Sequence, residues 1–205
     1  MSIKLTKNEQ KKQKDALKQY ERYLPTLQLK KKQLQAVIRS VEEEEEKIRL
    51  ERINAEKALS SWVSLWGENP LFKEKGLQSL VKPGVIKCQT ENIAGVKVPV
   101  FESLEFISIP YALEEYPLWV DRGVEALKNI VELKAKSTVL KKELDALSYE
   151  LKTTSQRVNL FEKVKIPETK ENIKKIAVAL GDASTAAVVR GKIAKKKLMR
   201  EGEAK

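Results

Sequence analysis

The side chains that most often carry out catalysis are scarce in this chain of 205 residues. It contains no histidine, so it cannot form a Ser-His-Asp or Cys-His relay or a histidine-based zinc or iron site. The single cysteine, Cys88, is followed by Gln-Thr-Glu with no base nearby, and it is interpreted as a small strand residue. The sequence therefore predicts no catalytic residue and no metal ligand.

Phosphate and cofactor sites are not predicted either. Neither a GxxxxGK[ST] pattern nor a GxGxxG pattern occurs, and such glycines are what open a helix toward a bound phosphate. Carboxylates are numerous, 29 in all, but none occupies an apolar, low-charge stretch that would shift its pKa. We therefore expect no cofactor and no acid–base site.

Basic residues near the two ends are the remaining candidates for binding. The chain has 40 basic and 29 acidic residues and a formal net charge of +11, which attracts acidic partners. The residues singled out are Lys4, Lys7 and Lys11 near the start, and Arg190, Lys195, Lys196 and Lys197 near the end. No aromatic residue interleaves with these basic residues, which disfavours a nucleic-acid-binding scaffold. Three interpretations stay open: such a scaffold, a basic coiled-coil tether, and tails that are simply solvated.

The elements that must position these residues follow from composition. Charged residues make up 34% of the chain, above the usual quarter or so, which suits long solvated helices. Aromatic and proline residues concentrate between Trp62 and Trp119. We therefore divide the chain into an N-terminal arm (1–61), an aromatic- and Pro-rich middle segment (62–119), and a C-terminal arm with a basic overhanging tail (120–205). No uncharged stretch approaches the roughly 18 residues that cross a bilayer, so direct membrane insertion is not expected.

Both arms carry a seven-residue repeat. In the first arm, steps of seven from Tyr20 to Trp62 meet only apolar residues, and a weaker track runs from Leu17 to Leu59. In the second arm, similar tracks run from Ala126 to Phe161 and from Ile130 to Lys165. This period requires a supercoil against a partner helix. The predicted fold is mainly α, a long antiparallel two-stranded coiled coil with a small inserted middle segment containing a β-hairpin; a parallel homodimer is the alternative.

The charges suggest a register for the two arms. If the arms fold back near residues 60 and 122, paired residue numbers add to about 182, and the acidic run Glu42–Glu46 meets the lysines between Lys134 and Lys142. Residues beyond about 181 are then left without a partner arm. Pro25 and Pro167 each remove a backbone donor, so a kink or break is expected at both.

The middle segment changes period. Strand-forming residues between 84 and 109 flank Asn92-Ile93-Ala94-Gly95, which predicts a hairpin with a turn there. Pro99 favours an edge position because it has no N–H to donate. A two-stranded hairpin alone is only marginally stable, so we expect it to lie against the aromatic cluster or against another protein. We also expect Trp62 and Trp119 to hold the two arms together below the hairpin.

Three stretches, in order along the chain, resemble the D subunit of the V-type/A-type rotary ATPases, and Tyr23-Leu24-Pro25 is closest to bacterial members. The first is Leu5-Thr6-Lys7 and the lysine-rich helix after it. The second is the hairpin sequence with Asn92, Gly95, Val96, Val98 and Pro99. The most specific is Arg157-Val158-Asn159, followed by Glu162 and Ile166-Pro167. The sequence departs from the family in having mainly lysine where an arginine-rich opening is usual, and in the small residues of 181–187.

The resemblance implies a non-catalytic axle. In that family, the D subunit is the central stalk that stands in the bore of a hexamer of A and B subunits, and it meets both a socket subunit on the membrane ring and the F subunit. Its rotation couples ATP hydrolysis or synthesis to proton or sodium translocation. The resemblance thus implies a cytoplasmic protein peripheral to the membrane, without cofactor or nucleic acid, whose basic ends, Lys4 to Lys11 and Arg190 to Lys197, contact the hexamer bore.

Overall fold

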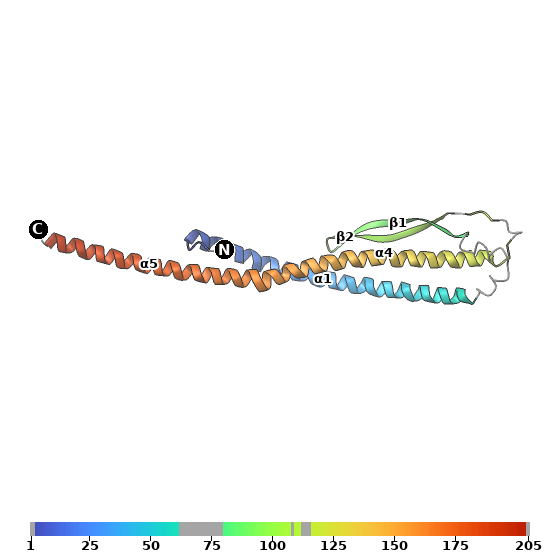
Figure 1. Ribbon diagram of the computed structural model, residues 1–205, viewed down its shortest axis with the longest axis horizontal. Coiled ribbons are helices and arrows are strands. Elements are labelled where there is room, and N and C mark those ends of the chain that lie inside the picture. Colours follow the sequence, from blue (N-terminus) through green and yellow to red (C-terminus); the bar gives the residue numbers. More distant parts are fainter. Residues whose placement is uncertain (1–2, 62–79, 108, 112–115, 204–205) are drawn as a thin grey trace. The chain divides into compact units, whose positions relative to one another are not determined.

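The computed structural model describes residues 3–61, 80–107, 109–111 and 116–203. The elements in chain order are α1 (Lys7–Ser60), β1 (Lys82–Ile93), β2 (Val96–Ile107), α4 (Val120–Asn159), the π-helix η2 (Leu160–Lys165) and α5 (Ile166–Glu203) (Figure 1). The predicted mainly helical fold with an inserted hairpin is therefore confirmed. The chain divides into a terminal unit, 1–30 with 154–205, and a central unit, 31–153.

Helix α1 begins where its sequence supplies a cap. The backbone N–H of Glu9 donates to Thr6 Oγ1 at 3.3 Å, and the N–H of Gln10 donates to the Thr6 carbonyl at 3.0 Å. This satisfies donors that have no partner inside the helix. The helix then continues through Pro25. A kink or a break is expected at that proline from the sequence, and the helix is not broken there.

The central unit pairs the second half of α1 with α4. Leu34, Ile38 and Val41 of α1 form one buried cluster with Leu140 and Leu147 of α4. Ser137 of α4 also donates a hydrogen bond from its hydroxyl to Glu45 Oε1 at 3.1 Å, and these two residues match the predicted register. The heptad tracks therefore form the inner face of an antiparallel helix pair, as the sequence predicts.

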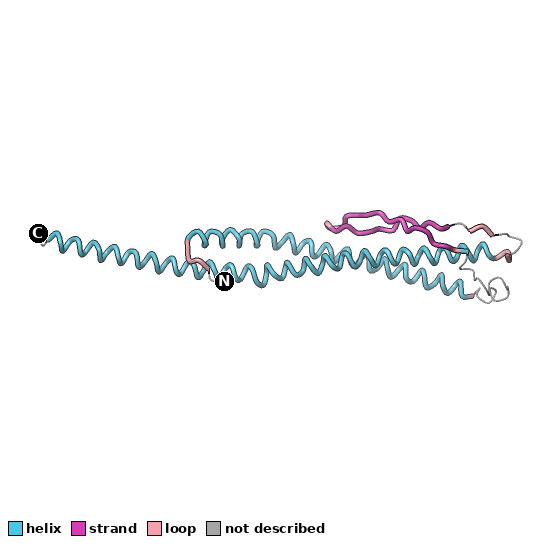
Figure 2. Tube along the Cα trace, turned by 45° about the horizontal axis from the view of Figure 1, so that its top comes forward, coloured by secondary structure: helices cyan, strands magenta, loops and turns pink. Residues whose placement is uncertain are grey.

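The hairpin packs lengthwise on this helix pair (Figure 2). Val98 of β2 is fully buried in the same cluster as Leu34 and Leu147. Further along β2, Lys136 and Lys128 of α4 lie over the rings of Phe101 and Phe106, at 5.4 and 5.8 Å from the ring centroids. The expected contact with the aromatic region also exists, because Phe106 packs with Val120 and Val124 beside Trp119. Trp62 lies outside the described residues.

The terminal unit pairs the start of α1 with η2 and α5, again antiparallel. Tyr20 stacks on Phe161 with ring centroids 5.3 Å apart, and Glu21 pairs with Lys170 at 3.2 Å. Ile176 is fully buried. From Gly181 to Met199 every side chain of α5 is exposed. The stretch beyond about residue 181, for which the register predicts no partner arm, is thus an exposed part of a continuous helix.

Candidate functional site

The basic residues predicted to form a binding surface are exposed. Lys4, Lys7 and Lys11 are exposed at the start of the chain, as are Arg190 and Lys195 to Lys197 on α5. Leu5 lines a shallow cavity with Glu171 and Val178. Arg190 therefore lies about 18 Å further along α5 than that cavity, at 1.5 Å per residue. The two sets of basic residues lie at the same end of the terminal unit. One set follows the other along the axis of α5, so they do not form a single patch.

The most specific family-like stretch coincides with an irregular turn. Arg157, Val158 and Asn159 end α4, Glu162 lies in the π-helix η2, and Ile166-Pro167 open α5. The N–H of Ile166 donates to the Phe161 carbonyl, five residues back, in place of the usual four. Pro167 has no N–H and its ring crowds the preceding turn, so we attribute the wider turn before it to this proline. The defect predicted at Pro167 is thus a π turn, without a break.

Within this turn, the exposed and buried residues separate. Val158 is 3% exposed, and Phe161 holds its stacking contact with Tyr20, whereas Arg157, Asn159 and Glu162 are exposed. Thr169, also buried, donates from its hydroxyl to the Lys165 carbonyl at 2.6 Å. This family-like stretch therefore combines residues that hold the helix pair together with polar residues that face outward, where they are available to another molecule.

The family-like hairpin residues form the turn and the buried end of the hairpin. Ala94 and Gly95 both have positive φ, 52° and 80°, which matches a type I′ turn between paired Ile93 and Val96. Asn92 pairs with Lys97, and Pro99 lies opposite Thr90 in a sheet with only two described strands. Cys88 lies exposed in β1, as a small strand residue. The strands begin at Lys82 and end at Ile107, close to the predicted 84–109.

The sequence predicts no carboxylate in an apolar, low-charge stretch that would shift its pKa, yet the fold buries Glu143 and shifts the pKa of its carboxyl. This residue of α4 is only 5% exposed. Burial, and secondarily the like charges of Glu44 and Glu91, raises the pKa of its carboxyl. Periodicity along α4 could not reveal this, because Glu44 belongs to α1 and Glu91 to the hairpin. A more modest signal was available: Glu143 follows Leu140 and precedes Leu144 and Leu147, so it borders the inner face.

Two searches of the described residues bear on other classes of site. No group of three or more histidine, cysteine, aspartate or glutamate side chains in the described ranges is arranged to hold a metal ion. Among the helices of the same ranges, none combines the length and the apolar character needed to span a bilayer. The features that stand out are instead the exposed basic tail of α5, the π turn and the hairpin that packs on the helix pair.

Comparison with known proteins gives a consistent result. The family model for the ATP synthase D subunit matches residues 9–196. The chain is 48% identical over 199 residues to the V-type ATP synthase D subunit of Borreliella burgdorferi, covering 97% of this chain and 96% of that one. It is 35% identical to the protein of the same name from Chlamydia muridarum, with 98% of both chains covered, and 36% identical to that from Chlamydia pneumoniae, with 97% and 94% covered.

Proposed function

Because this chain belongs to the family of ATP synthase D subunits, we propose that it is the central rotor shaft of a V-type/A-type ATPase or ATP synthase. In this role it couples ATP hydrolysis or synthesis in a hexamer of A and B subunits to proton or sodium translocation by a membrane ring. The observation that carries the proposal is the similarity to V-type ATP synthase D subunits along nearly the whole chain.

The helix pairing within each unit supports a mechanical role. A shaft must resist bending and twisting, and two helices packed along a buried seam do so better than one. In the central unit the seam contains Leu34 and Leu147, both fully buried, and in the terminal unit it contains Ile176. Truncating such residues typically costs about 2–5 kcal/mol, so each seam is stable enough to transmit force between its two helices.

The tail of α5 supports a rotating contact. Between Gly181 and Lys205 there is no aromatic residue, and aromatic side chains are the usual anchors of tight interfaces. The exposed cations there attract an acidic surface over a distance without locking into one position. We place this tail in the bore of the A/B hexamer, and the hairpin with the neighbouring part of the central unit near the socket subunit of the ring and near the F subunit.

In this proposal the chain is a non-catalytic subunit. Each angle of the shaft favours a different set of hexamer conformations, so it acts on ATP turnover by shifting populations and not by contributing a reacting group. The protein is then cytoplasmic and attached to the membrane only through the complex. A basic coiled-coil tether or nucleic-acid scaffold is the alternative, and the exposed tail is the observation that favours it.

Co-purification tests the proposal. A tagged full-length chain, expressed in its native host, should bring down two large ATP-binding subunits in equal amounts together with a small partner. Absence of both large subunits would contradict the shaft assignment. A tether would instead bind anionic liposomes on its own, and a nucleic-acid scaffold would bind DNA or RNA with a steep dependence on salt. The shaft proposal predicts weak binding in both of those assays.

A further inference from the structure

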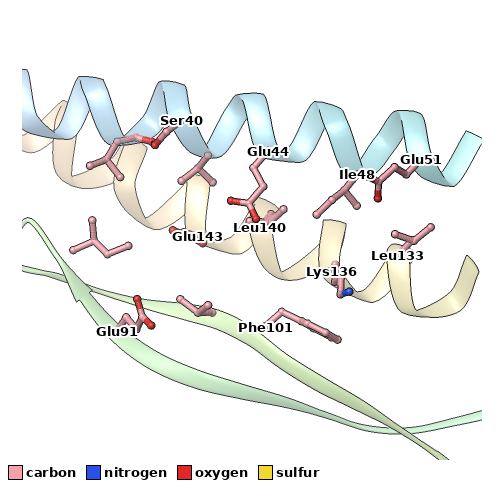
Figure 3. A pocket seen from close by; sticks show the side chains of 14 residues that line it. Ser40, Glu44, Ile48, Glu51, Glu91, Phe101, Leu133, Lys136, Leu140 and Glu143 are labelled. Carbon is pink, nitrogen blue, oxygen red and sulfur yellow. The ribbon is translucent and has the colours of Figure 1, made fainter. Parts of the chain in front are cut away.

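A cavity of about 560 Å³ that is open to solvent lies between α1, α4 and the hairpin of the central unit, and three of the glutamates that line it, Glu44, Glu51 and Glu91, are exposed. This volume falls within the range of small-molecule sites. Four glutamates from three elements line it: Glu44 and Glu51 of α1, Glu91 of β1 and Glu143 of α4. Figure 3 shows the carboxylates of Glu44 and Glu91 directed into the space between the helices and the hairpin. Most of the remaining wall is apolar.

The negative charge of this cavity is not balanced by its own lining. None of the four glutamates makes a hydrogen bond or an ion pair with any residue that the structure describes. Lys136 is the one lysine that lines the cavity, so the four carboxylates of the lining face a single ammonium group. It pairs with Glu132 Oε1 at 3.0 Å and lies 5.4 Å from the ring centroid of Phe101. A cation from outside the chain would therefore find four available carboxylates.

Glu143 is the strongest sign that something is to be bound. The residue as a whole is only 5% exposed, and it lines the cavity without a hydrogen-bond or ion-pair partner among the described residues, with Glu44 and Glu91 as the charged groups that act on it. Burying a carboxyl without a hydrogen bond or an ion pair costs free energy, and such groups usually serve a ligand or a reaction. Since the described residues gather no metal-binding group, a compact metal ion does not fit this arrangement.

The spacing of the carboxylates selects the shape of the ligand. Glu44 and Glu51 lie seven residues apart on α1, which places them about 10 Å apart along the helix axis. Ile48 lies between them on the same wall, and Val100 and Leu140 line the cavity as well. A ligand that matches this pattern has positive charges at its ends and methylene groups between them. We propose that the cavity between α1, α4 and the hairpin binds an aliphatic polyamine.

Calorimetric titration of the full-length chain with spermidine tests this proposal, at low ionic strength so that screening does not hide the interaction. We expect one spermidine to bind per chain. Ethylenediamine, whose two charges are too close together to reach both ends, and magnesium chloride at matched ionic strength should bind at least about tenfold more weakly. Equal affinity for magnesium and spermidine would mean simple screening of surface charge and would overturn the proposal.

Matched variants locate the site. Glu143→Gln and Glu91→Gln should each weaken spermidine binding about tenfold, since each removes one charge-assisted contact. Glu125→Gln removes the same charge from an exposed position of α4 outside the cavity and should leave the affinity unchanged. Circular dichroism checks that the variants fold. Wild-type affinity in both cavity variants, or an equal loss in Glu125→Gln, would exclude this cavity as the site.

Proton release gives a readout that a purely structural glutamate would not move. A bound ammonium group favours the ionised form of Glu143, so binding should release protons and strengthen as the pH rises. Repeating the titration in two buffers of different ionisation enthalpy measures this release, and Glu143→Gln should reduce it. Binding without proton release in the native chain would contradict a direct contact between the ligand and Glu143.

Discussion

Two glutamates of the central unit, Glu45 and Glu143, are largely shielded from solvent but differ in what surrounds their carboxylates. Glu45 occupies a seam position of α1, accepts a hydrogen bond from the Ser137 hydroxyl and lies 3.8 Å from the Lys141 ammonium group. Glu143 has no such partner, and the pKa of its carboxyl is raised by burial and by neighbouring glutamates. Exposure alone therefore does not decide whether a buried carboxylate is well accommodated; its partners do.

Replacing Glu143 by glutamine should stabilise the ligand-free chain at neutral pH. A carboxyl whose pKa is raised in the folded state binds protons more tightly there than in the unfolded state. Its destabilising effect is therefore absent below the unfolded pKa, grows as the pH rises through the raised pKa, and is complete above it. Glutamine keeps the shape without the charge. We expect a gain of about 1 kcal/mol at pH 8 that disappears near pH 4.

Urea unfolding of both proteins across this pH range measures the difference. The exposed Glu125→Gln variant serves as the control and should show no pH-dependent gain. An equal stability of Glu143→Gln and the native chain at every pH would mean that Glu143 is well solvated or paired. Glu143→Gln should therefore stabilise the folded chain but weaken the binding of spermidine. This one variant thus distinguishes what the Glu143 carboxylate costs in folding from what it contributes to binding.

At the scale of elements, the turn of the hairpin contains one unfavourable residue. Ala94 has a φ of 52°, in the left-handed region that only glycine and a few polar residues adopt readily. Ala94→Gly should therefore stabilise the hairpin by about 0.5–1 kcal/mol, less the small contact that the Ala94 methyl group makes with the buried cluster. Gly95→Ala, at a φ of 80°, should destabilise it by about 1 kcal/mol or more.

Hydrogen exchange of the β1 and β2 amides is the suitable measurement, because it reports local opening of the hairpin. Protection should rise in Ala94→Gly and fall in Gly95→Ala, with little change in the amides of α5. Faster exchange in Ala94→Gly would show that the packing of the methyl group outweighs the backbone preference.

The helices could be predicted from the sequence because their signals are local. The tracks through Leu34 and Leu147 mark the inner faces, and these positions are buried as expected. The hairpin was predictable for the same reason, since turn residues separate two runs of strand formers. At Pro167 the sequence indicates a defect but not its form, because a missing N–H and a crowded preceding turn are compatible with a kink, a break or a wider turn.

The acidic cavity could not be predicted, because it is assembled from three elements. Glu91 and Glu143 are far apart in sequence, and although Glu143 borders the inner face of α4, nothing in either element indicates that the two carboxylates meet. Their approach depends on where the hairpin packs, which is set by the burial of Val98 against the helix pair. Long-range packing of this kind leaves no periodic signal in either strand or helix.

At the scale of the whole molecule, the proposed function predicts that the tail of α5 acts in coupling and not in folding. Every described side chain from Gly181 to Met199 is exposed, and beyond the local helix backbone no atom of the structure lies within 4 Å of where a side chain would begin at Gly181 or Gly191. Changes on this surface should therefore alter the free energy of unfolding by no more than about 0.5 kcal/mol. Contacts made by the tail must instead be made with another protein of the complex.

Reversing the charge of Lys195, Lys196 and Lys197 to glutamate should slow ATP turnover coupled to ion movement in the reconstituted complex by about fivefold or more, because the tail would then repel the acidic surface it faces. The control is the same reversal at Lys32, Lys47 and Lys57, which are exposed on α1 in the central unit, outside the hairpin. It should leave coupled turnover much closer to the native rate. Thermal unfolding of both isolated variants should resemble that of the native chain. Normal coupled turnover in the tail variant would show that these lysines do not contact the hexamer, even where co-purification supports the shaft role.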